Sequence, residues 1–251
     1  MLSNKEIKYV KELQQKKFRK ERQEFIIEGK KMVTELLSEK SPFPLRALYV
    51  QEEALDVSLP AEAKIITPAQ MKRISGQSTP SGALAVVSIP SVQAETPSKG
   101  NLYLALDGIQ DPGNFGTLLR IADWFNVKAI YASYTCVELY NPKTVQATMG
   151  AVLRVPVYYI PLAPLLQKSI VPVLGSVLQG GENIYTLTLP EEGIVVLGNE
   201  SQGISPELMD RIQTQLYVPS YRKGSESLNV ATAAAVICAI FRKDLPPTPR
   251  S

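Results

Sequence analysis

Apolar positions in the first part of the chain predict a series of short helices and strands. Ile7, Val10 and Leu13 have the spacing of one helix face, and KKMVTELLSEK and PAQMKRIS also predict helices, the second starting at a Pro. Four short apolar runs predict strands: EFIIEG, RALYV, AKIIT and GALAVVSIP. These elements predict a small α/β domain, and the polar segment SVQAETPSKGN after it predicts a linker.

The pattern from residue 101 onward is that of alternating strands and helices. LYLALD is a nearly continuous apolar run, as expected of a strand buried on both faces of a parallel sheet. The loop DPGNFG, the helix TLLRIADWFN and the strand KAIYAS follow it. The alternation then continues with the helices KTVQATMGAV, SPELMDRI and SLNVATAAAVICAIFRK and the strands PVYYI, VPVLGSV, GIVVLGNE and QLYVPS. Ligands of open parallel sheets bind at the carboxyl ends of strands. We therefore expect the loops DGIQDPGNFG, LGNESQG and VPSYRKGSES to converge on one site.

Length and composition indicate a folded protein of two domains. The chain has 251 residues, of which 45% are apolar and 20% are charged with both signs mixed. No segment approaches the length of apolar sequence that spans a membrane, and MLSNKEIKYVKE lacks the apolar core of a signal peptide, so we expect a cytoplasmic protein without a membrane partner. Cys136 and Cys238 lack the spacing of a metal site or a disulfide framework and are expected to be buried free thiols.

The charged residues narrow the chemistry. The chain has no histidine, which removes the commonest general base near neutral pH and the commonest zinc ligand, and no metal site is expected. The net charge is +3, and residues 1–31 hold ten Lys or Arg against five Glu, which makes that segment +5 and the remainder −2. The basic stretch KKFRKER indicates contact with nucleic acid. A solvated helix face with Glu partners is the alternative.

The glycines of DPGNFGTLLR do not have the spacing of a nucleotide-binding loop. Gly113 and Gly116 are three residues apart with no Lys after them, unlike a dinucleotide fingerprint or a phosphate-binding loop. A helix that begins near Gly116 would place Arg120 one turn along. Its guanidinium and the free backbone N–H groups would then point at one spot, which suits a phosphate oxygen. A surface Arg after a glycine turn is the alternative.

Three segments carry a family resemblance. LDGIQDPGNFGTLLRIADWF, VVLGNESQGIS and VPSYRKGSESLNVATA, in this order, resemble the three motifs of the SpoU (TrmH) family of RNA ribose 2′-O-methyltransferases, and KTVQATMGAVLRVP resembles a further family segment. RQEFIIEGKKMVTELL is similar to an L30e-like substrate-binding domain. The resemblance implies an RNA-binding domain at 1–94 and a methyltransferase domain at 101–243. The polar composition predicts a linker at 95–100, and the prolines of DLPPTPRS predict a disordered tail at 244–251.

The resemblance also implies a fold and an activity. The family forms a SPOUT-type parallel sheet with a trefoil knot, which periodicity does not distinguish from an unknotted doubly wound sheet. It uses S-adenosylmethionine, with the active site at a homodimer interface. The extra N-terminal domain favours ribosomal RNA, specifically 23S RNA, over transfer RNA. A nonenzymatic RNA-binding protein with a decayed site and a Rossmann-type nucleotide enzyme are the rival classes, and the second lacks its glycine fingerprint.

The resemblance implies roles for particular residues. The catalytic positions it marks are Asn114, Arg120, Glu200, Ser227 and Asn229. Arg120 is expected to orient the 2′-hydroxyl and stabilise a phosphate, since a guanidinium is a poor base, and Glu200 to position Arg120 or a neighbouring amide. Ser227 and Asn229 are also good helix-capping residues, which is a structural alternative for both.

A second set of positions is implied to hold the cofactor: Gly175, Gly198, Val218 and Leu228. Gly175 ends a strand and is expected to let the cofactor approach closely. The third motif departs from the family pattern because the segment from Pro219 to Ser227 is one residue longer than in many members. Gln146 also stands where some members carry a basic residue.

Overall fold

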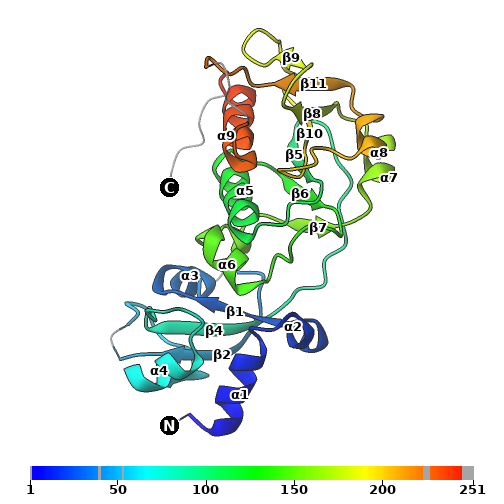
Figure 1. Cartoon of the computed structure of the whole chain (residues 1–251). Coiled ribbons are helices and arrows are strands. Elements are labelled where there is room, and N and C mark those ends of the chain that lie inside the picture. Colours follow the sequence, from blue (N-terminus) through cyan, green and yellow to red (C-terminus); the bar gives the residue numbers. More distant parts are fainter. Residues whose placement is uncertain (1, 39–40, 53, 223–226, 245–251) are drawn as a thin grey trace. The chain divides into compact units, whose positions relative to one another are not determined.

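The computed structural model describes residues 2–38, 41–52, 54–222 and 227–244 (Figure 1). The chain divides into two compact units: Met1–Val92 with Glu138–Arg154 form unit 1, and Gln93–Val137 with Val155–Ser251 form unit 2. Segment 138–154 therefore packs with unit 1, although the predicted boundaries assign it to the methyltransferase domain. Those boundaries stay a prediction, and the predicted disordered tail lies, from residue 245 onward, outside the described residues.

Unit 1 is built on a four-stranded sheet in the order β1-β4-β2-β3. Its strands are β1 (Glu24–Glu28), β2 (Leu45–Val50), β3 (Ala63–Ile65) and β4 (Ala83–Ser88), which confirms the four predicted strands. β4 pairs antiparallel with β1 and β2, and β2 pairs parallel with β3. Both faces of the sheet carry helices (Figure 1).

Several helices of unit 1 start at recognisable capping signals. They are α1 (Asn4–Glu12), α2 (Lys16–Arg22), α3 (Lys30–Leu36), α4 (Pro68–Ile74) and α6 (Pro142–Thr148). Ser3 and Thr67 each form a capping box with the residue three positions on. One core forms where the apolar faces of α1 and α4 meet Ile26, Leu84 and Val86 of the sheet.

Segment 138–154 is anchored in unit 1 by a buried ion pair and an aromatic contact. The guanidinium of Arg19 is only 2% exposed and donates to both carboxylate oxygens of Glu138, from Nε at 3.0 Å and from a terminal nitrogen at 2.7 Å. The rings of Phe25 and Tyr140 lie 4.3 Å apart between centroids. After α6, Met149 and Gly150 have left-handed backbones, and a short 3₁₀ turn (Ala151–Leu153) follows.

Unit 2 is a seven-stranded parallel sheet in the order β7-β6-β5-β10-β8-β11-β9. The strands are β5 (Leu102–Leu106), β6 (Ala129–Ala132), β7 (Val157–Tyr159), β8 (Val173–Val177), β9 (Glu182–Asn183), β10 (Gly193–Leu197) and β11 (Thr214–Tyr217). β5 and β10 are buried at every position, as the continuous apolar runs predict. The parallel sheet is thus confirmed, and the knotted path of the chain stays a prediction.

Helices cover both faces of this sheet (Figure 1). α5 (Pro112–Trp124) and α9 (Val230–Phe241) pack together on one face, and α7 (Leu162–Gln167) and α8 (Pro206–Met209) lie on the other. Arg242, just after α9, donates to the carbonyl oxygens of Phe125 and Asn126 at the end of α5, each at 2.9 Å. Cys136 and Cys238 are buried free thiols, as predicted.

Candidate functional site

The three motif loops of unit 2 are joined by a chain of side-chain hydrogen bonds. Asn229 donates from Nδ2 to Oδ1 of Asn114 at 2.8 Å. Asn114 in turn donates from its own Nδ2 to Oε1 of Glu200 at 2.7 Å. These residues follow β11, β5 and β10 respectively, so the carboxyl ends of these strands converge as the sequence predicts.

Each residue of this hydrogen-bonded chain is also fixed locally. Asn229 caps α9, because its Oδ1 accepts from the backbone N–H groups of Ala231 and Thr232. Asp111 caps α5 by accepting from the backbone N–H of Asn114 at 2.7 Å. The capping alternative for Asn229 is therefore correct, and the same side chain still uses its Nδ2 in the site. Arg120 and a neighbouring amide are the two partners expected for Glu200, and the structure shows the amide, that of Asn114.

The helix after the first motif begins earlier than predicted, which changes the position of Arg120. α5 starts at Pro112 rather than near Gly116, so DPGNFG supplies the N-cap and the first turn instead of a loop. Arg120 is eight residues after Pro112, or about 12 Å along the axis at about 1.5 Å per residue. The prediction that its guanidinium and the free N–H groups point at one spot is wrong, and the carboxylate of Asp111 occupies the helix start.

Arg120 itself is exposed on the outer side of α5. Within the described chain its guanidinium makes no hydrogen bond or ion pair, so none joins it to Asn114 or Glu200. A cation held on a rigid helix without a partner is available to a group outside this chain, such as a phosphate.

The second motif forms a tight loop whose shape depends on Gly198. A Cβ at Gly198 would lie 2.2 Å from the backbone carbon of Gly203, so only glycine fits. Asn199 holds the loop to the first motif by donating to the carbonyl of Gly108 at 2.8 Å, and its backbone pairs with Gly203. The backbone N–H of Ser205 donates to Asp107 at 2.8 Å.

The first and second motifs enclose a polar cavity of about 670 Å³, here called the acidic cavity. Asp107, Asp111 and Glu200 contribute three carboxylates to its wall. Within the described residues, no group of Cys, Asp and Glu side chains is placed to hold a metal ion. Sequence reasoning missed Asn199 and Asp107, although an Asn and an Asp directly after buried strands are the signal that would have found them.

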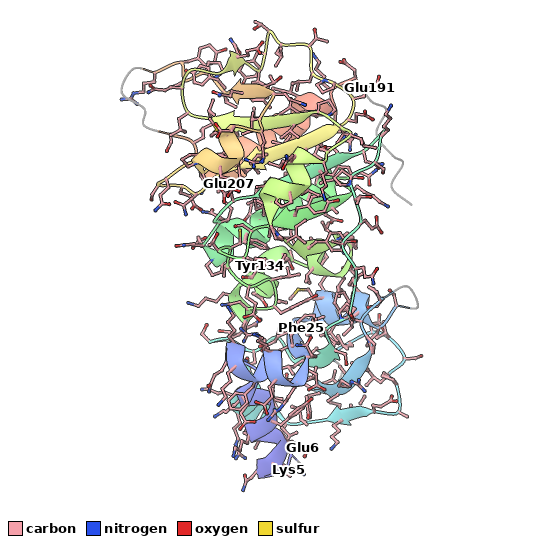
Figure 2. All side chains as sticks on the ribbon, turned by 90° about the vertical axis from the view of Figure 1, so that its right-hand side faces the viewer. Lys5, Glu6, Phe25, Tyr134, Glu191 and Glu207 are labelled. Atoms are coloured by element: carbon pink, nitrogen blue, oxygen red, sulfur yellow. The ribbon has the colours of Figure 1, made fainter. Side chains whose placement is uncertain are left out.

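The loop after β6 adds an aromatic residue near this cavity. Tyr134 is 70% exposed (Figure 2) and precedes Thr135, which lines the acidic cavity. An exposed ring beside a polar cavity offers a face on which a nucleobase can stack. No hydrophobic periodicity marks this residue, so sequence reasoning did not single it out.

A second cavity of about 490 Å³, here called the loop cavity, lies at the carboxyl ends of β8 and β11. Val218, Ser227 and Leu228 line it, which brings together three of the positions implied by the resemblance. Its wall also holds Leu178 and Tyr221, whose side chains are 61% and 92% exposed. The residue expected to lengthen the third-motif loop is Arg222 or Lys223; Arg222 lines the loop cavity, and Lys223 lies outside the described residues.

The two implied cofactor glycines do not line the loop cavity. A Cβ at Gly175 would lie 2.3 Å from the Cδ1 atom of Ile212, so a larger residue there would require that side chain to shift. Gly198 instead shapes the second-motif loop. Close approach of a cofactor to either glycine stays a prediction.

The basic stretch KKFRKER fits both of its interpretations, contact with nucleic acid and a helix face with Glu partners. Arg19 is buried in the ion pair with Glu138, and Arg22 pairs with Glu12 and lies 5.0 Å over the ring of Tyr9. The exposed lysines of α2 leave positive charge at the surface, at Lys16, Lys17 and Lys20. The arginines of this stretch thus stabilise the fold, and its exposed lysines are available to bind a phosphate backbone.

Comparisons with known proteins agree with this architecture. Residues 101–239 match the SpoU rRNA Methylase family, and residues 4–85 match the MRM3-like substrate binding domain. The chain is 31% identical to the 23S rRNA (guanosine(2553)-2′-O)-methyltransferase RlmP of Bacillus subtilis, over 93% of this chain and 94% of that protein. No helix in the described parts of the chain is long and apolar enough to cross a membrane.

Solved structures show the same fold. A putative RNA methyltransferase of the TrmH family from Porphyromonas gingivalis superposes with a TM-score of 0.86 at 37% identity, covering 97% of this chain and 99% of that one. An AdoMet-bound rRNA methyltransferase from Sinorhizobium meliloti superposes equally well, with a TM-score of 0.86 at 24% identity over 98% and 97% of the two chains. With its motif loops joined in one site and the family match covering more than half its length, the chain belongs to the SpoU rRNA Methylase family.

Proposed function

We propose that the protein transfers a methyl group from S-adenosylmethionine to a ribose 2′-hydroxyl of 23S ribosomal RNA. The observation that carries this proposal is the hydrogen-bonded chain of Asn229, Asn114 and Glu200, which draws the three motif loops into one site. Membership of the SpoU family and the similarity to RlmP along nearly the whole chain support the RNA substrate and the enzyme class.

The loop cavity suits S-adenosylmethionine in size and chemistry. Its volume of about 490 Å³ lies in the range of small-molecule sites, which are mostly apolar with a few polar groups. Val218 and Leu228 offer apolar walls for an adenine ring, and the Ser227 hydroxyl offers a hydrogen bond. When bound, the cofactor supplies a methyl group on a sulfonium, which reacts with an oxygen nucleophile placed in line with it.

Arg120 binds and orients the substrate in this proposal. Its exposed guanidinium, unpaired within the described residues, can grip a phosphate oxygen next to the target ribose. Because an Arg keeps its proton in proteins, the proton of the 2′-hydroxyl goes to that phosphate or to water. Glu200 keeps the amide of Asn114 directed, so that Asn114 and Asn229 hold the loops in place for the reaction.

A second copy of the chain completes the site in this proposal. Arg120 makes no hydrogen bond or ion pair with the described loop residues of its own chain, so its guanidinium is available to a partner subunit. The exposed Leu178 and Leu228 beside the loop cavity give apolar surface that a partner would cover. A cytoplasmic homodimer acting on ribosomal RNA through unit 1 is the assembly that we infer.

The substrate is tested by transfer of labelled methyl from S-adenosylmethionine to purified ribosomal and transfer RNA fractions. We expect label in 23S RNA. Label in transfer RNA alone would keep the chemistry and overturn the substrate, and label in neither fraction, with cofactor still bound, would overturn the enzymatic proposal in favour of a binding protein. A thermal shift with S-adenosylhomocysteine but not with NAD separates this cofactor from that of a Rossmann enzyme.

The role of Arg120 is tested by Arg120→Ala. We expect methyl transfer to be lost while the affinity for S-adenosylhomocysteine is nearly unchanged, because the guanidinium contacts RNA rather than the cofactor. Lys128→Ala removes another exposed cation of unit 2 and is the matched control. Normal turnover in Arg120→Ala would refute the role.

A further inference from the structure

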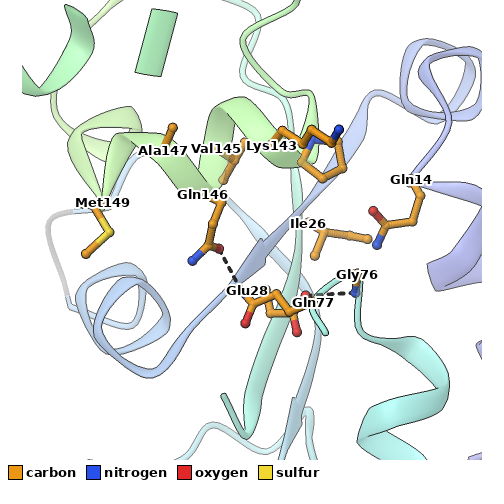
Figure 3. A pocket seen from close by; sticks show the side chains of 11 residues that line it. Gln14, Ile26, Glu28, Gly76, Gln77, Lys143, Val145, Gln146, Ala147 and Met149 are labelled. Carbon is orange, nitrogen blue, oxygen red and sulfur yellow. Dashed lines mark hydrogen bonds between the residues drawn. The ribbon is translucent and has the colours of Figure 1, made fainter. Parts of the chain in front are cut away.

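Unit 1 contains a cavity of its own, here called the glutamine pocket. Its volume is about 410 Å³, and its walls come from β1, from the loops after α1 and α4, and from α6 (Figure 3). Three glutamines, at positions 14, 77 and 146, line it together with the carboxylate of Glu28. None of the residues assigned to methyl transfer lines this cavity.

Glu28 is a buried acid with hydrogen-bonding capacity to spare. The residue is only 7% exposed, and its two carboxylate oxygens each accept one hydrogen bond, from the Ser75 hydroxyl and from the backbone N–H of Gly76. Each oxygen has a second lone pair. A ligand with N–H donors would fill the remaining acceptor sites, and donors placed there would favour the charged carboxylate against burial, which raises the pKa of this group.

The glutamines add further amide groups that can bond to a ligand. Gln77 donates to the side-chain oxygen of Gln146 at 2.8 Å, which leaves the Gln146 nitrogen as a donor (Figure 3). The Gln14 carboxamide lies against Gly76, where a Cβ would come within 3.0 Å of it, and it has no hydrogen bond within the described chain. The pocket therefore offers both acceptors and amide donors.

The remaining walls are apolar. Ile26 and Val145 line the pocket beside the polar groups, and Met149, which is 48% exposed, stands at its edge with a left-handed backbone. Apolar side chains next to a few hydrogen-bonding groups are the usual lining of a small-molecule site and can enclose an unstacked nucleobase. Lys143 also lines the pocket, from the exposed surface of α6, and gives a positive charge suited to a phosphate.

We propose that the glutamine pocket binds one unpaired guanine of the RNA substrate. Guanine presents two adjacent N–H donors and one carbonyl acceptor on its Watson–Crick edge, which matches the Glu28 carboxylate beside an amide N–H. Adenine and cytosine present one donor group there, and uridine presents a single N–H between two carbonyls. This inference rests on the proposed RNA substrate, and it gives unit 1 a base-specific contact in addition to the charge of its lysines.

The test measures base preference in the full-length protein, without methyl transfer. The probes are four labelled undecauridylates that carry guanosine, adenosine, cytidine or uridine at the centre, and binding is followed by fluorescence anisotropy. We expect the guanosine oligomer to bind about tenfold more tightly than the other three, a difference of about 1.4 kcal/mol. A competition experiment with guanosine monophosphate at the same concentration as the oligomer tests whether the pocket binds a free nucleotide instead.

Variants assign the preference to the pocket. Gln14→Leu with Gln146→Leu removes amide groups while keeping side-chain volume, and we expect it to abolish the guanosine preference. Gln15→Leu changes an exposed neighbouring glutamine outside the pocket and should leave the preference intact. Glu28→Gln should act like the double variant, and circular dichroism shows whether it folds.

Four results would overturn the proposal. They are equal or absent binding of the four oligomers, preference for another base, an unchanged preference in the double variant, and competition by guanosine monophosphate at the concentration of oligomer. If the protein methylates 23S RNA but shows no preference for guanosine, the pocket proposal fails and the proposed function stands. If the protein prefers guanosine but transfers no methyl group, the proposed function fails and the pocket proposal stands.

Discussion

Asn114→Ala tests whether the three motif loops depend on one amide. The substitution removes the bond that Asn114 donates to Glu200 and the bond that it accepts from Asn229. Each hydrogen bond contributes about 1 kcal/mol to the stability of unit 2. A bond to a carboxylate is usually stronger, but Glu200 is exposed and water weakens the interaction. The substitution should therefore destabilise unit 2 by about 2 kcal/mol. In a domain of this size that loss lowers the unfolding midpoint by about 4 to 8 °C.

The chain offers a probe specific to this unit. Trp124 at the end of α5 is the sole tryptophan of the sequence, so its fluorescence during denaturation follows unit 2. A double-mutant cycle with Glu200→Ala should give a coupling energy of about 0.5 to 1 kcal/mol. Gln110→Ala, an exposed change in the same loop, is the control. Strictly additive losses, or an equal loss in the control, would refute the linked-loop reasoning.

Single contacts support three further predictions. Gly198→Ala should abolish methyl transfer with little change in circular dichroism, because its Cβ would meet the backbone of Gly203 and open the loop; full activity would contradict this. Arg242→Ala should lower the Trp fluorescence midpoint, since two hydrogen bonds to the carbonyl groups directly after α5 are lost, at about 2 kcal/mol in total. Hydrogen bonds from Lys64 and from the backbone N–H of Ser3 lower the pKa of Glu6 from 4.5 to about 2. The charged Glu6 therefore stabilises the fold above about pH 4.5, and this stabilisation is lost as the pH falls toward 2. Acid titration of unfolding should therefore be shallower in Glu6→Gln, and an unchanged slope would argue against the pair.

Local patterns predicted most of the elements because their causes are local. The buried runs of β5 and β10 and the small-residue helix α9 follow directly from side-chain polarity along the chain. The start of α5 differs from the prediction because Gly113 and Gly116 indicate a loop, whereas Asp111 and Pro112 form a strong N-cap and first-turn pair. The N-cap pair therefore contains the information that places Arg120 two turns into the helix.

Long-range contacts could not be predicted in the same way. The ion pair of Arg19 with Glu138 and the ring contact of Phe25 with Tyr140 attach segment 138–154 to unit 1. Hydrophobic periodicity is a local property, so it does not predict contacts between residues more than a hundred positions apart. Deleting residues 1–94 would strip α6 of the sheet on which it packs, so substitution of the exposed lysines of α2 is the cleaner test of RNA affinity.

The position of the transferred methyl group tests the central claim most directly. The protein is incubated with 23S RNA and S-adenosylmethionine carrying a labelled methyl group, and the RNA is then hydrolysed in alkali. A methylated 2′-oxygen cannot attack the adjacent phosphate, so the account predicts label in an alkali-stable dinucleotide. Label released in mononucleotides, as a methylated base would give, would contradict it.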